Sequence, residues 1–336
     1  MKNIFKTGVM AIAAVAALSS CSDWTDPEPV DTTYQGIGEA DPDTYANYLA
    51  NLRAYRGNGH KKAYAWFANS ASFVSQADHI LAVPDSIDVL VLHEPATVNA
   101  DVLNEMVTKR SNTGMEMAYT IDYAAMQTAW SSQKEIADAD GKDFPVWSAF
   151  MADSLNSALA YAPTYGFNRV ILAFDGRSPL SMTPAELTAY KAEETAFLGT
   201  AVNYLKSHSV AYDYMGIPAN LTEKSMLDGA GMIFLSESAK ATNANELSTI
   251  VGRSSVSGVP AGKFGVMCAL PVLDATQASV GYWNNGYASV GTARWARSAD
   301  GVRAIGMTNL YDGYYNTAFQ YPACRAAIQT LNPSAK

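Results

Sequence analysis

The chain has 336 residues, a length that suits either two average domains or one large α/β barrel. Hydrophobic residues make up 49% and charged residues 16%, which excludes a disordered, collagen-like or coiled-coil chain. The net charge of −9, without a basic cluster, argues against nucleic-acid binding. Three Cys and four His argue against a disulfide scaffold and against a multi-histidine metal cage.

The N-terminus has the pattern of a secretory signal. Lys2 and Lys6 precede an apolar run that is too short for a stable membrane span. The next segment, Leu18-Ser19-Ser20-Cys21, resembles a bacterial lipobox, in which the cysteine receives lipid. We expect residues 1–20 to be removed and Cys21 to carry the membrane anchor; an ordinary secretory signal with a chance cysteine is the alternative. Loss of the two lysines changes the net charge from −9 to −11, so the lipid rather than the surface would hold the protein at an anionic membrane.

The following residues, 22–42, are acidic and proline-containing and lack apolar periodicity, which is typical of a tether. Their start, Ser22-Asp23-Trp24-Thr25-Asp26, resembles the acidic export tag of surface lipoproteins in glycan-foraging Gram-negative bacteria. This resemblance implies an outer-membrane, cell-surface location and an outer-membrane glycan-uptake complex as partner. The predicted division is a signal peptide over 1–20, lipidated cysteine, tether and lead-in over 21–60, and one folded domain over 61–336.

Apolar strand-like runs then alternate with amphipathic helical stretches, the pattern of βαβ units. The predicted strands are Ala63–Phe67, Ile87–His93, Gly114–Ile121, Arg169–Phe174, Val210–Tyr214, Met232–Leu235, Lys263–Leu270 and Val302–Met307. The predicted helices include Asn99–Thr108, Val146–Tyr161, Pro184–Ser207, Asn243–Val251 and Pro322–Leu331. Eight such units predict a (β/α)8 TIM barrel. A doubly wound open sheet is the competitor, but no G-x-G-x-x-G follows the first strand.

One segment, Tyr165-Gly166-Phe167-Asn168-Arg169-Val170-Ile171-Leu172-Ala173-Phe174-Asp175-Gly176, is more specific. It resembles the fourth strand of family 18 glycoside hydrolases, the chitinases and endo-β-N-acetylglucosaminidases, whose pattern is Y-G-[LF]-D-G-[VI]-D-[IF]-D-x-E. Tyr165, Gly166, Phe167 and Val170 match it. A late segment, Ile305–Gly313, is similar to the last strand of the endoglycosidase branch, which extends the resemblance over most of the mature chain.

The resemblance fails at the acids. In the family the final Glu protonates the glycosidic oxygen, and an Asp two residues earlier orients the substrate N-acetyl group. Here Asp175 and Ala173 stand at these positions. Alanine supplies no charge, and Asp175 is about one methylene shorter than Glu. Period-2 alternation places Arg169, Ile171, Ala173 and Asp175 on one face, so Ile171 and Ala173 are expected to fill the barrel while Asp175 reaches its mouth. The alternative is that Asp175 caps the loop at Gly176.

Polar and aromatic residues follow the other predicted strands, and such side chains read sugar hydroxyls and stack on sugar rings. The expected ligand-binding residues are Asn69, His93, Glu94, Asp122, Tyr123, Asp175, Asp213, Tyr214, Glu237, Trp283, Asn309 and Tyr311. The loop Tyr282–Tyr287, which contains Trp283, is either a sugar platform or a turn built on Asn285-Gly286. His93, Glu94 and Asp122 lack metal-site spacing, and Ser236 has no G-x-S-x-G elbow. Cys268 and Cys324 are either two buried thiols or one bridge.

The sequence therefore predicts a lipid-anchored glycan-binding protein with a glycosidase-like barrel that lacks the catalytic acid pair, and with no cofactor and no metal. The family resemblance implies an N-acetylglucosamine-containing ligand, such as the glycan of a glycoprotein. One alternative is an active endo-β-N-acetylglucosaminidase in which Asp175 is the acid and a carboxylate from another strand replaces the missing Asp. The other is a structural subunit of a surface complex that binds no sugar.

Overall fold

The structure is a computed structural model that describes residues 41–284 and 286–333. Contacts divide the chain into two units, residues 1–48 and 49–336. The division lies within helix α3, Pro42–Arg56. Cys21, the predicted signal peptide and most of the predicted tether lie outside the described residues. Within the described residues, no helix has the length and apolar character needed to span a membrane.

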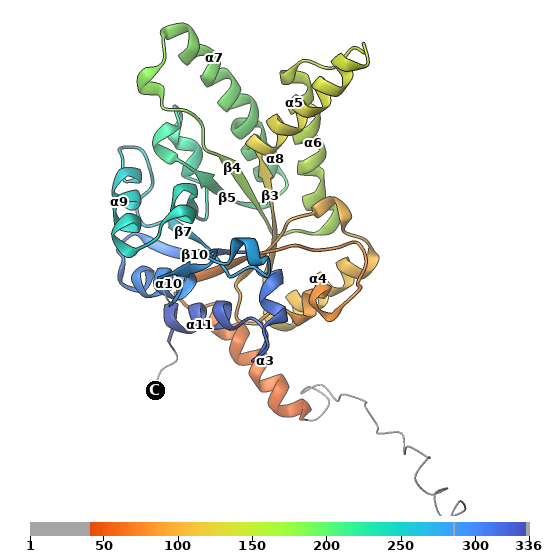
Figure 1. Cartoon of the computed structure of the whole chain (residues 1–336), viewed down its shortest axis with the longest axis vertical. Helices are drawn as coiled ribbons and strands as arrows, with labels where there is room; N and C mark the ends of the chain where they lie inside the picture. The colour runs from red at the N-terminus through yellow and green to blue at the C-terminus, as the bar shows by residue number, and fades with distance from the viewer. Residues whose placement is uncertain (1–40, 285, 334–336) are drawn as a thin grey trace, which may run out of the picture. The chain divides into compact units, whose positions relative to one another are not determined.

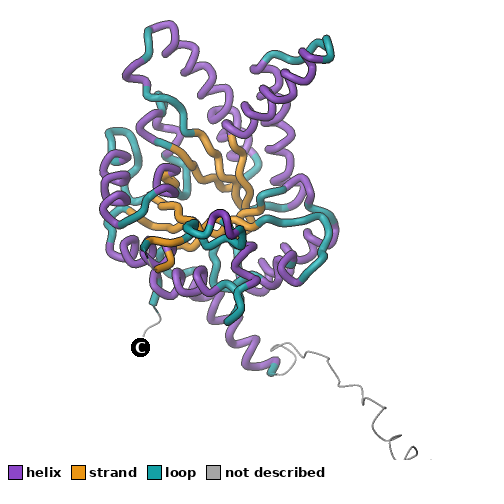
Figure 2. Tube along the Cα trace, in the orientation of Figure 1, coloured by secondary structure: helices purple, strands orange, loops and turns teal. Residues whose placement is uncertain are grey.

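In the second unit, eight parallel strands close into a barrel in which each strand pairs with its neighbours in chain order, and β1 pairs with β10. This confirms the predicted (β/α)8 TIM barrel. The strands lie at the centre in Figures 1 and 2, with helices around them. Their bounds are β1 Lys62–Phe67, β2 Val89–Leu92, β3 Glu116–Asp122, β4 Arg169–Phe174, β5 Ala211–Gly216, β6 Ile233–Leu235, β7 Phe264–Ala269 and β10 Val302–Thr308. A short hairpin, β8 Tyr282–Trp283 and β9 Gly286–Tyr287, follows β7.

The helices that follow the strands are α4 Ala100–Thr113, α5 Tyr123–Ala139, α6 Trp147–Tyr165, α7 Pro184–Glu194, α8 Thr200–Ser207, α9 Ala244–Ser254, α10 Ala288–Ser298 and α11 Pro322–Leu331. The predicted helix Pro184–Ser207 is continuous, with a π-helical turn at Thr195–Gly199 between α7 and α8. The predicted helices do not include α5 or α10.

The barrel interior is a small apolar core made by alternate strand residues. Tyr64, Trp66 and Phe234 are its large members, and they pack with Val89, Val91, Ala118, Ile171, Met267 and Ala304. Gly265 makes room for Phe234, because a Cβ there would lie 2.5 Å from the Phe234 ring. The outward strand faces pack against the helices in a second, larger cluster. Both faces of the sheet are therefore buried, and polar chemistry is left to the strand ends.

Candidate functional site

Strand β4 points alternate residues into the barrel, as the period of two predicts. Arg169 forms ion pairs with Glu116 and Asp213, both at 2.8 Å, near the start of the strand. Ile171 is fully buried in the interior core. Ala173 is 6% exposed and lines a cavity at the mouth together with Asp175. The burial of Ala173 agrees with the prediction that it fills the barrel, and Ala173 also lines the cavity at the mouth.

Asp175 lies directly after β4 and is exposed. Its carboxylate Oδ1 accepts a hydrogen bond of 2.6 Å from Ser236 Oγ, at the end of β6. Its backbone carbonyl accepts a hydrogen bond of 2.9 Å from Nδ2 of Asn220, which lies in the segment after β5. The alternative in which this carboxylate caps its own loop is not what the structure shows, since the bond crosses to another strand. Asp175 is thus held at the mouth by a neighbouring hydroxyl.

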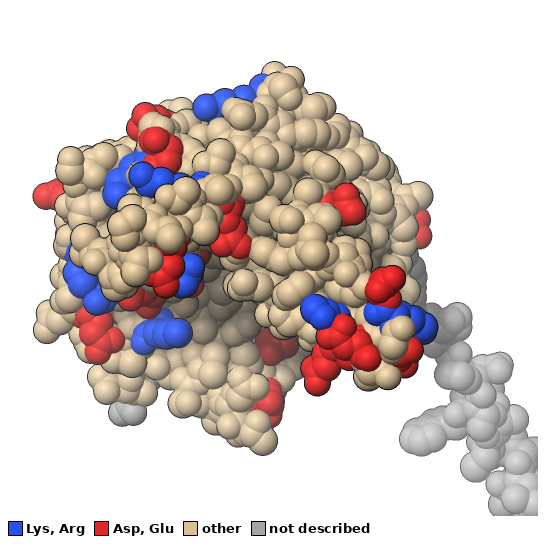
Figure 3. Space-filling view, turned by 90° about the horizontal axis from the view of Figure 1, so that it is seen from above, with Lys and Arg blue, Asp and Glu red and all other residues tan. Residues whose placement is uncertain are grey.

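Two cavities meet at Asp175 and Ser236, which line both. The larger, about 590 Å³, lies among the ends of β3 and β4 and the helices α5 and α7; its polar and aromatic lining includes Asp122, Tyr123, Gln127, Arg177, Tyr190 and Glu193. Figure 1 shows α5 and α7 extending beyond the ends of β3 and β4 and diverging from each other. Figure 3 shows a hollow in the face seen from above, with acidic and basic side chains around it. The mouth is therefore a charged, concave surface.

In the larger cavity, two helices position a carboxylate that no sequence pattern singles out. Glu193 on α7 accepts hydrogen bonds at Oε1 from the Tyr123 hydroxyl and, at 2.7 Å, from Trp147 Nε1. Burial, followed by the bond to Glu193, raises the pKa of Tyr123. Both donors use the same oxygen of Glu193. No motif marks this contact, because Tyr123 and Glu193 are 70 positions apart and meet only through helix packing.

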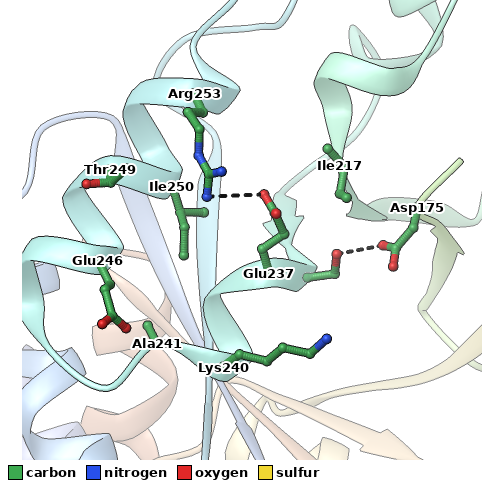
Figure 4. Close-up of a pocket in the computed structure, with 10 residues that line it drawn as sticks. Asp175, Ile217, Glu237, Lys240, Ala241, Glu246, Thr249, Ile250 and Arg253 are labelled. Carbon is green, nitrogen blue, oxygen red and sulfur yellow. Dashed lines mark hydrogen bonds and ion pairs between the residues drawn. The ribbon is translucent and has the colours of Figure 1, made fainter. Parts of the chain in front are cut away.

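The smaller cavity, about 490 Å³, lies between the end of β6 and α9 and is drawn in Figure 4. Glu237 forms an ion pair of 3.8 Å with Arg253. The Lys240 side chain extends through the view towards the side on which Asp175 lies. The Glu246 side chain points to the start of α9, where it accepts a hydrogen bond of 2.7 Å from the Thr242 amide. This side of the mouth thus combines both signs of charge with the apolar surface of Ile217, Ala241 and Ile250.

Of the predicted ligand-binding residues, the cavities bring together Asp122, Tyr123, Asp175 and Glu237. Asp122 also caps α5, because it accepts hydrogen bonds of 2.8 and 3.1 Å from the amides of Ala124 and Ala125. Asp213 and Tyr214 do not lie at the barrel mouth, so the prediction that they bind ligand there is wrong. Strand β5 continues to Gly216, which leaves Asp213 fully buried beside Arg169 and the Tyr214 hydroxyl bonded to the Phe174 carbonyl.

The remaining predicted residues do not line these two cavities. Asn69 joins two loops. It donates a hydrogen bond of 2.9 Å to the Glu94 carbonyl and accepts one of 2.9 Å from the Glu94 amide. His93 and Glu94 are exposed. Three others make structural bonds: Trp283 Nε1 to the Ala241 carbonyl, Asn309 Nδ2 to Leu270 O and the Tyr311 hydroxyl to Asp78 Oδ1.

Metal and thiol chemistry find no support in the described residues. They contain no cluster of His, Cys, Asp or Glu that could hold a metal ion, so His93, Glu94 and Asp122 do not converge. Cys268 and Cys324 are free and buried, which decides between the two thiol alternatives. Burial raises the pKa of each thiol to about 12, which makes both poor nucleophiles.

The structure resembles those of several glycoside hydrolases. Its similarity to a BT1044 selenomethionine variant covers 89% of this chain and 96% of that chain, at a TM-score of 0.59 and 12% identity. An endo-beta-N-acetylglucosaminidase from Cordyceps militaris is similar at a TM-score of 0.60 and 11% identity, over 85% of this chain and 96% of that chain. A family 18 chitinase from Pseudoalteromonas aurantia is similar at a TM-score of 0.50 and 10% identity, over 80% and 100%.

At these identities the structural likeness shows the fold. No curated protein matches the sequence. Residues 25–330, which include the whole barrel, match glycoside hydrolase family 18, BT1044-like. This chain therefore belongs to glycoside hydrolase family 18, in its BT1044-like group.

Proposed function

We propose that this protein is a lipid-anchored glycan-binding member of glycoside hydrolase family 18 that binds its sugar at the barrel mouth without cleaving it. The observation that carries the proposal is Ala173, which lines the cavity beside Asp175 at the position where the family resemblance calls for an acid. A methyl group neither orients an N-acetyl group nor balances positive charge. The mouth keeps its cavity while lacking one of the two catalytic groups.

The lining of the larger cavity suits a carbohydrate. Its volume of about 590 Å³ lies in the range of small-ligand sites. Tyr123 supplies aromatic surface, and Asp122, Asp175 and Glu193 supply acceptors for sugar hydroxyls. Arg177 lies over the Tyr190 ring at 5.8 Å, so a donor is held at the same rim. These groups support the proposal of a neutral or partly charged oligosaccharide as ligand.

The sugar class and the location rest on the sequence. Family membership supports an N-acetylglucosamine-containing oligosaccharide, such as an N-glycan on a glycoprotein. The lipobox-like segment ending at Cys21 supports an outer-membrane anchor facing the cell surface, within reach of a glycan-uptake complex. The proposed role is capture of glycan for such a complex.

The test combines binding with product analysis on the Ser22–Lys336 fragment. Thermal shift against a glycan panel detects binding, because a ligand at 100 times its dissociation constant stabilises the fold by about 2.7 kcal/mol. Incubation with an N-glycosylated protein and with chitooligosaccharides, followed by mass spectrometry, detects cleavage. We expect binding without products, and weaker binding in Asp175→Asn. Asp153→Asn, at an exposed position on α6, is the matched control.

Two results contradict the proposal in different ways. Turnover above background that is lost in Asp175→Asn but kept in Asp153→Asn shows an active hydrolase. A panel without any stabilising glycan supports the structural-subunit alternative.

The hydrolase alternative has one observation in its favour. Asp122 at the end of β3 is the register partner of Ala173, and both line the cavity with Asp175. A carboxylate from the neighbouring strand thus lies beside the position of the missing acid. If this alternative holds, Asp122→Asn abolishes turnover while the stability is kept, since asparagine caps a helix as well as aspartate does. Unchanged turnover in Asp122→Asn would exclude Asp122 as the replacement.

A further inference from the structure

A cavity at the opposite end of the barrel is lined by basic side chains. It has a volume of about 380 Å³ and is lined by Gly59, His60, Lys61, Arg297, Arg303, Leu331 and Asn332. The lining, so far as the described chain supplies it, contains no Asp or Glu. A neighbouring cavity of about 770 Å³ shares His60 and Asn332 and adds Arg325. We call the first of these the basic cavity.

The fold itself brings these residues together. Lys61 directly precedes β1, Arg303 is the second residue of β10, and Arg297 lies in the last turn of α10. Because β1 and β10 are paired parallel strands, their starts lie at the same end of the barrel. This is the N-terminal end, away from Asp175 and the proposed glycan site.

Lys61 is fixed in place. Its Nζ donates to the carbonyls of Ala296 and, at 3.0 Å, of Ala299, at the end of α10. Asn332 holds the Lys61 backbone with two hydrogen bonds. Its Nδ2 donates to the Lys61 carbonyl at 2.7 Å, and its Oδ1 accepts from the Lys61 amide at 3.3 Å. Burial lowers the pKa of Lys61, and the positive charge of Arg303 lowers it further, against the opposing effect of Asp300. Arg303 is therefore close enough to act electrostatically on Lys61, which lines the same cavity.

The guanidinium groups of Arg297 and Arg303 are available to bind a ligand. Arg297 and Arg303 are exposed, and within residues 41–284 and 286–333 neither guanidinium has a hydrogen bond or an ion pair. Each guanidinium offers five N–H donors in a rigid planar fork. In a chain of net charge −9, an acid-free cavity with two unpaired guanidinium groups is a local site of positive potential.

We infer that the basic cavity binds a phosphoryl group, held by the guanidinium forks of Arg297 and Arg303. Arginine pairs with phosphate oxygens through two parallel hydrogen bonds, and such bonds are stronger than neutral ones. Lys61 adds positive charge while its own donors stay on the α10 carbonyls. Lipid headgroups and free phosphate compounds are the two sources of this chemistry.

The first experiment measures phosphate binding by thermal unfolding of the full chain in a neutral, phosphate-free detergent. Inorganic phosphate and glycerol 3-phosphate are titrated against chloride at constant ionic strength. We expect both phosphates to raise Tm, and Arg297→Gln/Arg303→Gln to weaken the binding at least about tenfold, because hydrogen bonds to charged groups are the stronger kind. The control, Arg294→Gln/Lys206→Gln, removes two exposed charges outside the cavity and should bind as the wild type does.

The second experiment separates the sources. Chains carrying Cys21→Ser are sedimented with phosphatidylglycerol or phosphatidylcholine vesicles, with the arginine pair intact or replaced. A lipid source predicts that the replacement reduces binding to phosphatidylglycerol vesicles, whereas a soluble source predicts a change with free phosphate alone. The inference is overturned if the arginine variant and the control behave alike in both experiments. Neither result bears on glycan binding at Asp175.

Discussion

Arg169 and Asp213 form an ion pair inside the barrel, with 2.8 Å between Nη1 and Oδ1 and no exposure of Asp213. Asp213 Oδ1 also accepts 2.8 Å from the Met232 amide, and within the described chain its Oδ2 has no hydrogen-bond partner. Burial raises the pKa of Asp213, and Arg169 is the largest influence that lowers it. The pair therefore ties β4 to β5 and, through Glu116, to β3.

Arg169→Met should destabilise the fold by about 3–5 kcal/mol, because it leaves Asp213 buried without its counter-charge. Chemical denaturation measures the change in the free energy of unfolding. Arg169→Met/Asp213→Asn removes the uncompensated charge and should recover part of the loss. A loss below about 1 kcal/mol in the single variant would show that the pair is not a structural link.

Restoring one acid should not restore hydrolysis. Ala173→Asp leaves Asp175 one methylene short, and Asp175→Glu leaves no group to balance the substrate charge; residues that act as a unit are strongly non-additive. Ala173→Asp/Asp175→Glu alone contains both groups needed for turnover. The apolar neighbour Ile171 should raise the pKa of the introduced Asp. Product analysis by mass spectrometry tests all three variants, and turnover by either single variant would contradict the proposed loss of catalysis.

His60 should make stability depend on pH. Its hydrogen bond with Asp88, 2.9 Å from Nε2 to Oδ1, raises the pKa of His60 above its usual value of about 6.5. A group whose pKa is raised by folding stabilises fully below its unfolded pKa, and this contribution is lost as the pH rises through the folded value. The difference in unfolding free energy between the wild type and His60→Gln should therefore be largest near about pH 5.5 and shrink towards about pH 8.

Denaturation at a series of pH values checks this expectation. His208→Gln is the control, because His208 stacks on Tyr204 and has no carboxylate partner in the described part of the chain. A pH-independent difference for His60→Gln would show that the bond to Asp88 does not shift the titration.

Cys21 should anchor the protein in the membrane, as the lipobox-like segment before it predicts. Fractionation of cells should find the wild type with the outer membrane and Cys21→Ser released, because the loss of the acyl chains removes about 0.8 kcal/mol per buried CH₂. If the wild type is soluble in the periplasm and the mutant is unchanged, the protein is not a lipoprotein.

Features that depend on local periodicity were predictable from the amino-acid sequence. The eight apolar runs became the barrel strands, and alternation along β4 correctly placed Arg169, Ile171, Ala173 and Asp175 on its inner face. The replacement of the expected acid by Ala173 is likewise visible in the amino-acid sequence. Side chains alternate with a period of two in every strand, so these features do not depend on how distant segments pack.

Which distant side chains share the mouth depended instead on tertiary packing. Ser236, after β6, donates a hydrogen bond to Asp175, after β4. Glu193 bonds to Tyr123 and Trp147 because the end of α7 lies near the starts of α5 and α6. Strand length also mattered: two further residues in β5 moved Asp213 from the predicted rim into the barrel, where Arg169 binds it. Helix packing and strand ends are set by contacts between residues 40 to 70 positions apart, such as 44 positions for Arg169 and Asp213, and a single sequence carries no local signal for them.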